Sequence, residues 1–170
     1  MIVIKLLLRI NDIKSIIIHH SSFIANMYLK DKNKEDLLQF INSWGGETFA
    51  KTLDIQFTDI DVENETLTAT MPVLPRIHQP FGIMHGGASC VLAETMGSSL
   101  SNIFIDGEKY FGVGTNINTN HLRSKKDGMV TAVARFIRKG KTMHVSEIEI
   151  RDEKGQLISH TTMTNTIIKK

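Results

Sequence analysis

A pair of glycines at a predicted helix start could polarise a carbonyl group. Gly86 and Gly87 follow His85 and open a segment that reads as a long helix, from about residue 85 to 103. The first N–H groups of a helix have no partner inside it, and the positive end of the helix dipole lies at the same place. Because glycine has no side chain, a carbonyl can approach these donors closely, as oxyanion stabilisation requires. A tight turn into a helix would also explain the pair.

An acidic side chain lies two turns further along the same predicted helix. Glu94 has Ser98 four residues after it and Cys90 four residues before it, so the three project from one face. A buried carboxylate needs a partner or a function, and burial would raise its pKa. Glu94 could act as a general base on water, attack an acyl carbonyl directly, or be an exposed surface charge. The apolar residues around it disfavour a broad solvated face.

The other reactive side chains are not arranged for catalysis. Cys90 is the only cysteine, and a lone cysteine in an apolar helix is usually a packing residue. The seven histidines show neither His-x-x-x-His nor His-Glu-x-x-His spacing, which argues against a metal site. The Gly-x-Ser-x-Gly signature of a serine hydrolase does not occur, nor does a phosphate-binding or dinucleotide motif. We therefore expect neither a metal nor a cofactor.

Composition narrows the class of protein. The chain has 170 residues, of which 41% are hydrophobic and 22% charged, and its net charge is +2. A strongly basic nucleic-acid binder is not expected, and one cysteine excludes an internal disulfide framework. No run of about 20 apolar residues predicts a membrane span, which favours a cytoplasmic protein. We expect one domain over residues 33–170. Residues 1–32 are expected to be a poorly ordered or loosely packed extension, or sequence upstream of a start at Met27.

The hydrophobic period changes along the chain from helical to strand-like. Leu92, Met96, Leu100 and Ile103 recur at helical spacing and should face a core. Tight polar turns separate the last four strands, so we predict that consecutive strands pair antiparallel. The result is an α+β fold with a sheet packed on the central helix. The predicted helices cover residues 33–44 and 85–103, and the predicted strands cover residues 52–59, 66–71, 111–121, 129–138, 142–151 and 156–168.

Several motifs carry a resemblance to a known family. Residues 79–88 read Gln-Pro-Phe-Gly-Ile-Met-His-Gly-Gly-Ala, followed by Leu-Ala-Glu-Thr and Gly-Ser. Asn-His-Leu-Arg at residues 120–123 and Lys-Gly-Lys-Thr at residues 139–142 add to this pattern. Over roughly residues 44–168 the chain resembles the hotdog-fold acyl-CoA thioesterases. It is most similar to the group of 4-hydroxybenzoyl-CoA thioesterases and 1,4-dihydroxy-2-naphthoyl-CoA hydrolases. It departs from that family at Ser124, where a proline is common.

The resemblance implies a reaction and a site. An acyl-CoA with an aromatic acyl group would be hydrolysed without a cofactor, by Glu94 as base or nucleophile and with the Gly86 N–H polarising the carbonyl. Gln79 and His85 would line the reaction centre, and Ser98 would help to hold the water or the acyl group. The sheets of two subunits would pair side by side in a homodimer or homotetramer, with the site between subunits. Glu94 and the glycine amides must then share one cavity.

Alternatives stay open at this point. His85 could simply cap the helix, and the domain could be a non-catalytic module that binds acyl-CoA on the same fold. A dehydratase or hydratase is disfavoured by the Leu-Ala-Glu-Thr stretch. A last question concerns basic residues that either contact CoA phosphates or belong to an ordinary solvated hairpin; they are Arg135, Arg138, Lys139 and Lys141, with Arg123 and His121 as further candidates.

Overall fold

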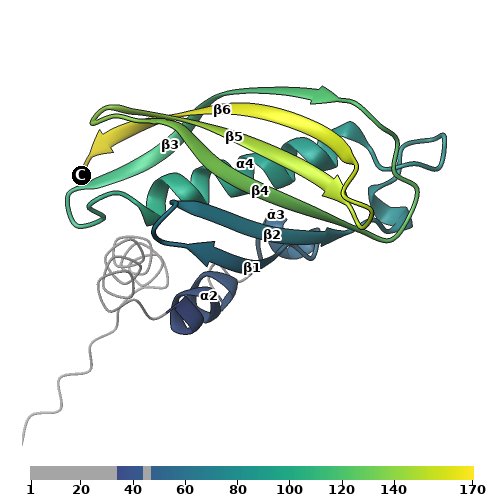
Figure 1. Ribbon diagram of the computed structural model, residues 1–170, viewed down its shortest axis with the longest axis horizontal. Helices are drawn as coiled ribbons and strands as arrows, with labels where there is room; N and C mark the ends of the chain where they lie inside the picture. The colour runs from purple at the N-terminus through teal and green to yellow at the C-terminus, as the bar shows by residue number, and fades with distance from the viewer. Residues whose placement is uncertain (1–33, 44–46) are drawn as a thin grey trace, which may run out of the picture.

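A six-stranded antiparallel sheet wraps around one long helix (Figure 1). The computed structural model describes residues 34–43 and 47–170, so the predicted extension over residues 1–32 lies outside the described residues. The helices are α2 (Lys34–Ser43), α3 (Phe49–Thr52), the 3-10 turn η1 (Pro75–Ile77) and α4 (Gly86–Ile103). The strands are β1 (Gln56–Asp61), β2 (Thr66–Pro72), β3 (Tyr110–His121), β4 (Met129–Lys139), β5 (Met143–Asp152) and β6 (Leu157–Lys169). The α+β class is confirmed.

The strand order corrects one prediction. The sheet runs β1-β2-β4-β5-β6-β3, so β3 pairs with β6 at an edge, and β4 lies between β2 and β5. The prediction that β3 and β4 pair as consecutive strands is therefore wrong. The segment between them is not a tight turn, because its backbone bonds to three other parts of the chain. Lys125 O accepts from Met84 N–H, Gly128 O accepts from Val73 N–H, and Leu122 N–H donates to a carbonyl of β6.

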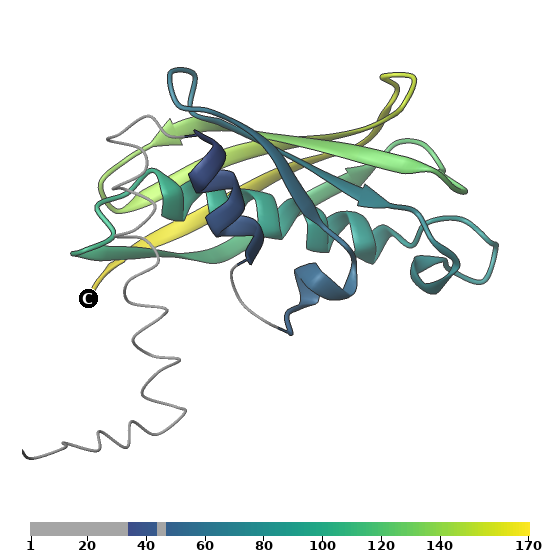
Figure 2. The same cartoon turned by 90° about the horizontal axis from the view of Figure 1, so that it is seen from below.

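The apolar face of α4 forms the core with the middle of the sheet. Leu92, Met96 and Leu100 are fully buried, as their spacing predicts. They face strands whose inward residues are small on β4, Ala132 and Ala134 among them, so the helix lies close to the sheet. Burial of each large aliphatic side chain stabilises the fold by about 1.5–3 kcal/mol. Figure 2 shows α4 running along one face of the sheet.

The two edge strands of the sheet, β1 and β3, are covered by side chains to different extents. Beside β1 lies α2, whose Asn42 side chain bonds both the N–H and the C=O of Phe57 at 2.8 Å. On β3, the side chain of Asn102 from α4 bonds both the N–H and the C=O of Gly112, at 2.9 and 3.0 Å. Beyond Gly112, β3 presents the exposed apolar residues Val113 and Ile117. The β3 edge is therefore blocked at one end and accessible along the rest.

Local turn chemistry explains where two elements begin. The strand predicted from residue 52 starts at Gln56, because Phe49–Thr52 forms a helical turn whose N-cap is Thr48. The Thr48 hydroxyl accepts from Lys51 N–H at 3.4 Å. In the loop before α4, Gly82 has a φ of 73°, in the left-handed region that glycine tolerates. This turn lets Gln79 N–H bond to Ile83 O at 2.9 Å and places Gln79 beside the start of α4.

Candidate active site

A cleft of about 290 Å³ opens at the N-terminus of α4. It lies between the loop that precedes the helix, the end of β3 and the segment that follows β3. The polar lining residues are Gln79, Gly86, Ser89, His121, Arg123, Ser124 and Lys125, and the apolar ones are Ile83, Met84, Leu122 and Ile158. The predicted residues Gln79 and Gly86 are thus brought together.

The two glycines have different roles at the start of α4. Gly87 N–H donates to Nδ1 of His85 at 2.8 Å, so this donor is occupied. Within residues 34–43 and 47–170, Gly86 N–H has no hydrogen-bond partner. A Cβ on Gly86 would lie 2.6 Å from Nε2 of His121, so a larger residue here would have to displace the His121 ring. One free donor therefore faces the cleft, and it is the one predicted to polarise a carbonyl.

His85 and His121 lie beside different cavities near the start of α4. His85 is the N-cap of α4, as the alternative interpretation proposed, and it does not line the cleft. Its ring lies instead beside a second cavity of about 380 Å³, together with Phe49 and His78. The ring next to Gly86 belongs to His121, which sequence reasoning considered only as a phosphate ligand. No spacing signal could have found this contact, because it depends on β3 ending beside the start of α4.

Glu94 is held by a short chain of hydrogen bonds on another part of α4. Its side chain is half-buried, and Ser98 Oγ donates to its Oε1 at 3.3 Å. Asn165 Nδ2 on β6 donates in turn to Ser98 Oγ at 3.3 Å. A side chain at Gly114 on β3 would overlap the carboxylate, so glycine leaves the space that Glu94 occupies. We call Glu94, Ser98, Asn165 and Gly114 the carboxylate seam.

Burial sets the electrostatics of Glu94. Desolvation raises the pKa of the Glu94 carboxyl above its ordinary value, and the hydrogen bond from Ser98 opposes this in part. In the described part of the chain, Glu94 makes no ion pair. A carboxylate that is oriented by one hydroxyl but not neutralised by a cation keeps its basicity, which suits a general base or a nucleophile.

A single chain does not bring the carboxylate to the cleft. Glu94 follows Gly86 by eight residues, which is about 12 Å along a helix axis. Glu94 is not among the residues that line the cleft. It faces β3, the edge strand of the sheet, through Gly114. The expected shared cavity is therefore absent within the described part of one chain.

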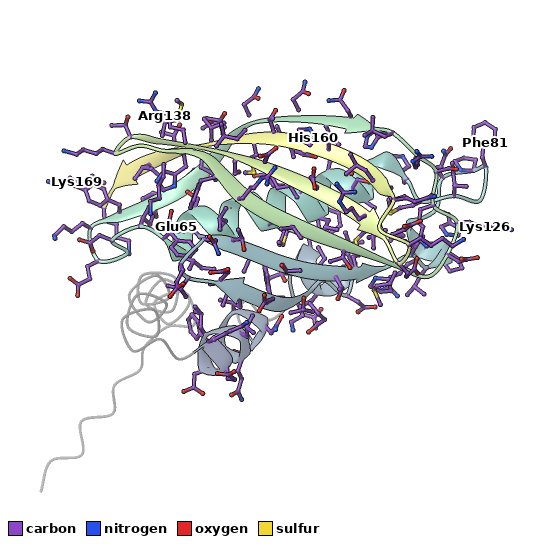
Figure 3. All side chains as sticks on the ribbon, viewed as in Figure 1. Glu65, Phe81, Lys126, Arg138, His160 and Lys169 are labelled. Carbon is purple, nitrogen blue, oxygen red and sulfur yellow. The ribbon has the colours of Figure 1, made fainter. Side chains whose placement is uncertain are left out.

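The candidate phosphate-binding residues lie in two groups, toward opposite ends of the molecule. Arg123 and Lys125 lie at the cleft, where Lys125 pairs with Glu153 at 2.5 Å and the pKa of Glu153 falls to about 2. The hairpin between β4 and β5 lies at the other end, as Arg138 and Lys126 show in Figure 3. On this hairpin, Arg135 pairs with Glu147 and Lys139 with Glu65. These pairs leave Arg138 and Lys141 as the hairpin cations without an ion pair among the described residues.

Among the residues that the structure describes, no three His, Cys, Asp or Glu side chains are grouped so as to hold a metal ion. In the same residues, no helix has the length and apolar character needed to cross a membrane.

Comparisons with known proteins agree with this architecture. Residues 81–159 match the model of the family described as "Thioesterase superfamily". The 1,4-dihydroxy-2-naphthoyl-CoA hydrolase of Escherichia coli is 43% identical over 131 residues, which are 77% of this chain and 94% of that protein. The proofreading thioesterase EntH of Cronobacter turicensis is 39% identical over 120 residues, 70% of this chain and 85% of that protein.

Solved structures show the same fold. A mutant of thioesterase PA1618 from Pseudomonas aeruginosa superposes with a TM-score of 0.75 at 41% identity, covering 78% of this chain and 94% of that chain. Thioesterase HI1161 from Haemophilus influenzae gives a TM-score of 0.74 at 36% identity, covering 78% and 90%. The fold is thus the hotdog fold expected from the resemblance. The chain belongs to the thioesterase superfamily. It is a thioester hydrolase.

Proposed function

We propose that the protein hydrolyses acyl-CoA thioesters in the cytoplasm, preferring aromatic acyl groups, and releases the free acid and CoA. The relative named 1,4-dihydroxy-2-naphthoyl-CoA hydrolase supports this substrate class, because it is 43% identical and 94% of its length is covered. The site needs no cofactor, since each chemical step can be assigned to groups of the chain itself.

Glu94 is the catalytic carboxylate. The observation that carries this proposal is a half-buried acid with a raised pKa, oriented by Ser98 and without an ion pair in the described chain. As a base, it takes a proton from water while the water oxygen bonds to the thioester carbon. As a nucleophile, its own oxygen forms that bond, and water hydrolyses the resulting anhydride. In both routes the C–S bond breaks and the CoA sulfur leaves as a thiolate, which then takes a proton.

The cleft would stabilise the negative charge that develops on the thioester carbonyl oxygen. The free Gly86 N–H, at the positive end of the α4 dipole, donates a hydrogen bond to the developing oxyanion. The Gln79 side chain lines the same cleft and provides a further amide donor. Arg123 and His121 lie where an anionic part of CoA could be bound, in keeping with their candidacy as phosphate ligands.

A homodimer joined at the β3 edge would complete the site. Glu94 faces β3, and this edge carries exposed Val113 and Ile117 beyond the block at Gly112. Pairing two copies along the free part of β3 would satisfy its unpaired backbone groups and cover these apolar side chains. Such pairing would present Glu94 of one protomer to the partner subunit's Gly86, which one chain alone cannot do.

The test is thiol release from benzoyl-CoA, naphthoyl-CoA and straight-chain acyl-CoA esters. We expect turnover with an aromatic preference, and a loss in kcat of about 10²–10⁴ for Glu94→Gln at similar KM. The matched control is Glu63→Gln, at an exposed turn, which should hydrolyse as the wild type does. Binding of the esters without turnover by the wild type would favour a non-catalytic acyl-CoA-binding module. Full activity of Glu94→Gln would remove Glu94 from the mechanism.

A further inference from the structure

The carboxylate seam contains a buried amide that the reaction as proposed does not use. Asn165 lies on β6, paired to Gly114 on β3 and to His144 on β5, and its side chain points at α4. Only 1% of the residue is exposed. Its Nδ2 donates to Ser98 Oγ at 3.3 Å, while its buried Oδ1 has no hydrogen-bond partner among residues 34–43 and 47–170. A buried polar atom without a partner destabilises the fold, so this amide calls for an explanation.

The explanation lies in the direction of the hydrogen bonds. A serine hydroxyl has one proton to donate and lone pairs with which to accept. Because Asn165 donates to Ser98 Oγ, the Ser98 proton is free to point at Glu94 Oε1. The reversed amide would present its oxygen and draw that proton away. Glu94 would then lose the one hydrogen bond that its side chain makes in the described chain.

We infer that Asn165 is a positioning residue for the hydrolysis, which acts through Ser98 to keep the Glu94 carboxylate oriented and ionised for its reaction. This inference rests on the proposed role of Glu94. It assigns the unpartnered Oδ1 a physical reason: the amide is held with its NH₂ group toward α4, and the oxygen goes unsatisfied as a consequence.

A neutral donor suits this place better than a cation. The pKa of Glu94 is shifted by burial and by the Ser98 hydroxyl, and no charged group of the described α4, β3 or β6 residues contributes to the shift. A lysine or arginine at residue 165 would form a buried ion pair and lower the basicity of the carboxylate. An amide orients the serine without that loss. Its anchor is rigid as well, because β6 is paired on both sides at this residue.

Two substitutions of nearly equal size test the inference. Asn165→Asp places an acceptor where the donor was, so Ser98 should turn its proton away from Glu94, and a second carboxyl adds like charge nearby. We expect kcat to fall about three- to thirtyfold, KM to change less than about twofold, and the acid limb of the kcat/KM profile to move up by about half a pH unit or more. Asn165→Leu removes the donor without adding charge and should give a smaller shift in the same direction.

Controls separate a positioning role from a structural one. Gln156→Glu makes the same amide-to-carboxyl change at an exposed residue just before β6 and should leave the pH profile unchanged. In a Ser98→Ala background, Asn165→Leu should no longer move the acid limb, because the relay through Ser98 is already broken. If thermal melting shows that Asn165→Asp or Asn165→Leu is unstable, Asn165→Ser replaces it as a variant with a smaller side chain. The measurement is again the pH profile of kcat/KM.

The outcomes are distinguishable from those for the proposed function. If Glu94→Gln hydrolyses normally, the proposed role of Glu94 fails first. If Glu94→Gln is inactive but Asn165→Asp and Asn165→Leu keep the wild-type acid limb, the inference on Asn165 alone is overturned. An equal effect of Asn165→Leu with and without Ser98 would also overturn it, because Asn165 would then not act through Ser98.

Discussion

The cleft at the start of α4 and the carboxylate seam treat their polar groups in opposite ways. In the cleft, the Gly86 N–H and the side chains of Gln79 and Arg123 make no hydrogen bond within the described residues. In the seam, the Ser98 hydroxyl and the Asn165 amide each donate to a defined acceptor. A site that stabilises a developing anion must keep donors free, whereas a base must be oriented in advance without being neutralised. In the proposed mechanism, the cleft would stabilise the oxyanion and the carboxylate seam would supply the base or nucleophile.

The largest expected effect is a change in activity when subunits with different defects form mixed dimers, which tests whether one site contains Glu94 of one subunit and Gly86 of the other. Glu94→Gln subunits alone should be nearly inactive, and Gly86→Ala subunits alone should keep about a tenth of the wild-type activity or less. When they are unfolded together and refolded, half of the dimers should be mixed, and one of the two sites in each mixed dimer should be intact. We therefore expect a return to about a quarter of wild-type activity, measured as thiol release. Activity no higher than the mean of the two parents would mean that one chain contains the whole site.

Adding a side chain at residue 86, in the cleft, should cause the next largest loss of kcat. In Gly86→Ala the added Cβ meets the His121 ring, at 2.6 Å from Nε2 before any shift, so the ring must move and the methyl group crowds the free N–H. We expect kcat to fall about tenfold to a hundredfold. The acid limb of the pH profile should stay in place, because Glu94 is unaffected. As a matched control, Gly155→Ala has no atom within 4 Å of its added Cβ but has a φ of 76°, so it should lower Tm without lowering kcat.

Removing a hydrogen bond from the carboxylate seam should lower kcat less, but it should move the acid limb of the pH profile, which Gly86→Ala leaves in place. Ser98→Ala removes the hydrogen bond that lowers the pKa of Glu94, and burial, which raises it, remains. The acid limb of kcat/KM should therefore move to higher pH, and kcat at neutral pH should fall about three- to tenfold. Ser99→Ala, on the next residue of the helix, is the control. An acid limb at lower pH than in the wild type would contradict the assigned cause of the shift.

The smallest effect is on stability. Since burial raises the pKa of Glu94 in the fold, folding favours its protonated form. The stability that results is present in full below the unfolded-state pKa and is lost as pH rises through the folded-state pKa. Glu94→Gln mimics the protonated form at every pH, so its Tm should be slightly higher than that of the wild type at pH 7. The difference should shrink as pH falls toward 4, as followed by circular dichroism; a difference that grows would be inconsistent with a raised pKa.

Sequence patterns predicted the helix α4 better than the pairing of the sheet strands around it. The stripe of Leu92, Met96 and Leu100 is buried as expected, because helical periodicity acts over a few residues. The pairing of β3 with β6 was missed, since it joins residues about fifty apart in the chain, such as Val113 and Thr166. The contact of His121 with Gly86 and the relay from Asn165 to Ser98 both depend on that pairing. Neither could be found from local spacing.

By itself the sequence determined that a glycine pair opens a long helix, that Glu94 and Ser98 share one face of it, and that the chain folds as an α+β domain of the thioesterase type. These features depend on local backbone preference and on motif. Only the tertiary structure decided that His85 caps the helix while His121 lies over Gly86, that Asn165 orients Ser98, and that the carboxylate and the cleft stay apart within one chain. The physical reason is that strand order, and with it every contact between β3, β6 and α4, is set by long-range packing that short-range periodicity does not encode.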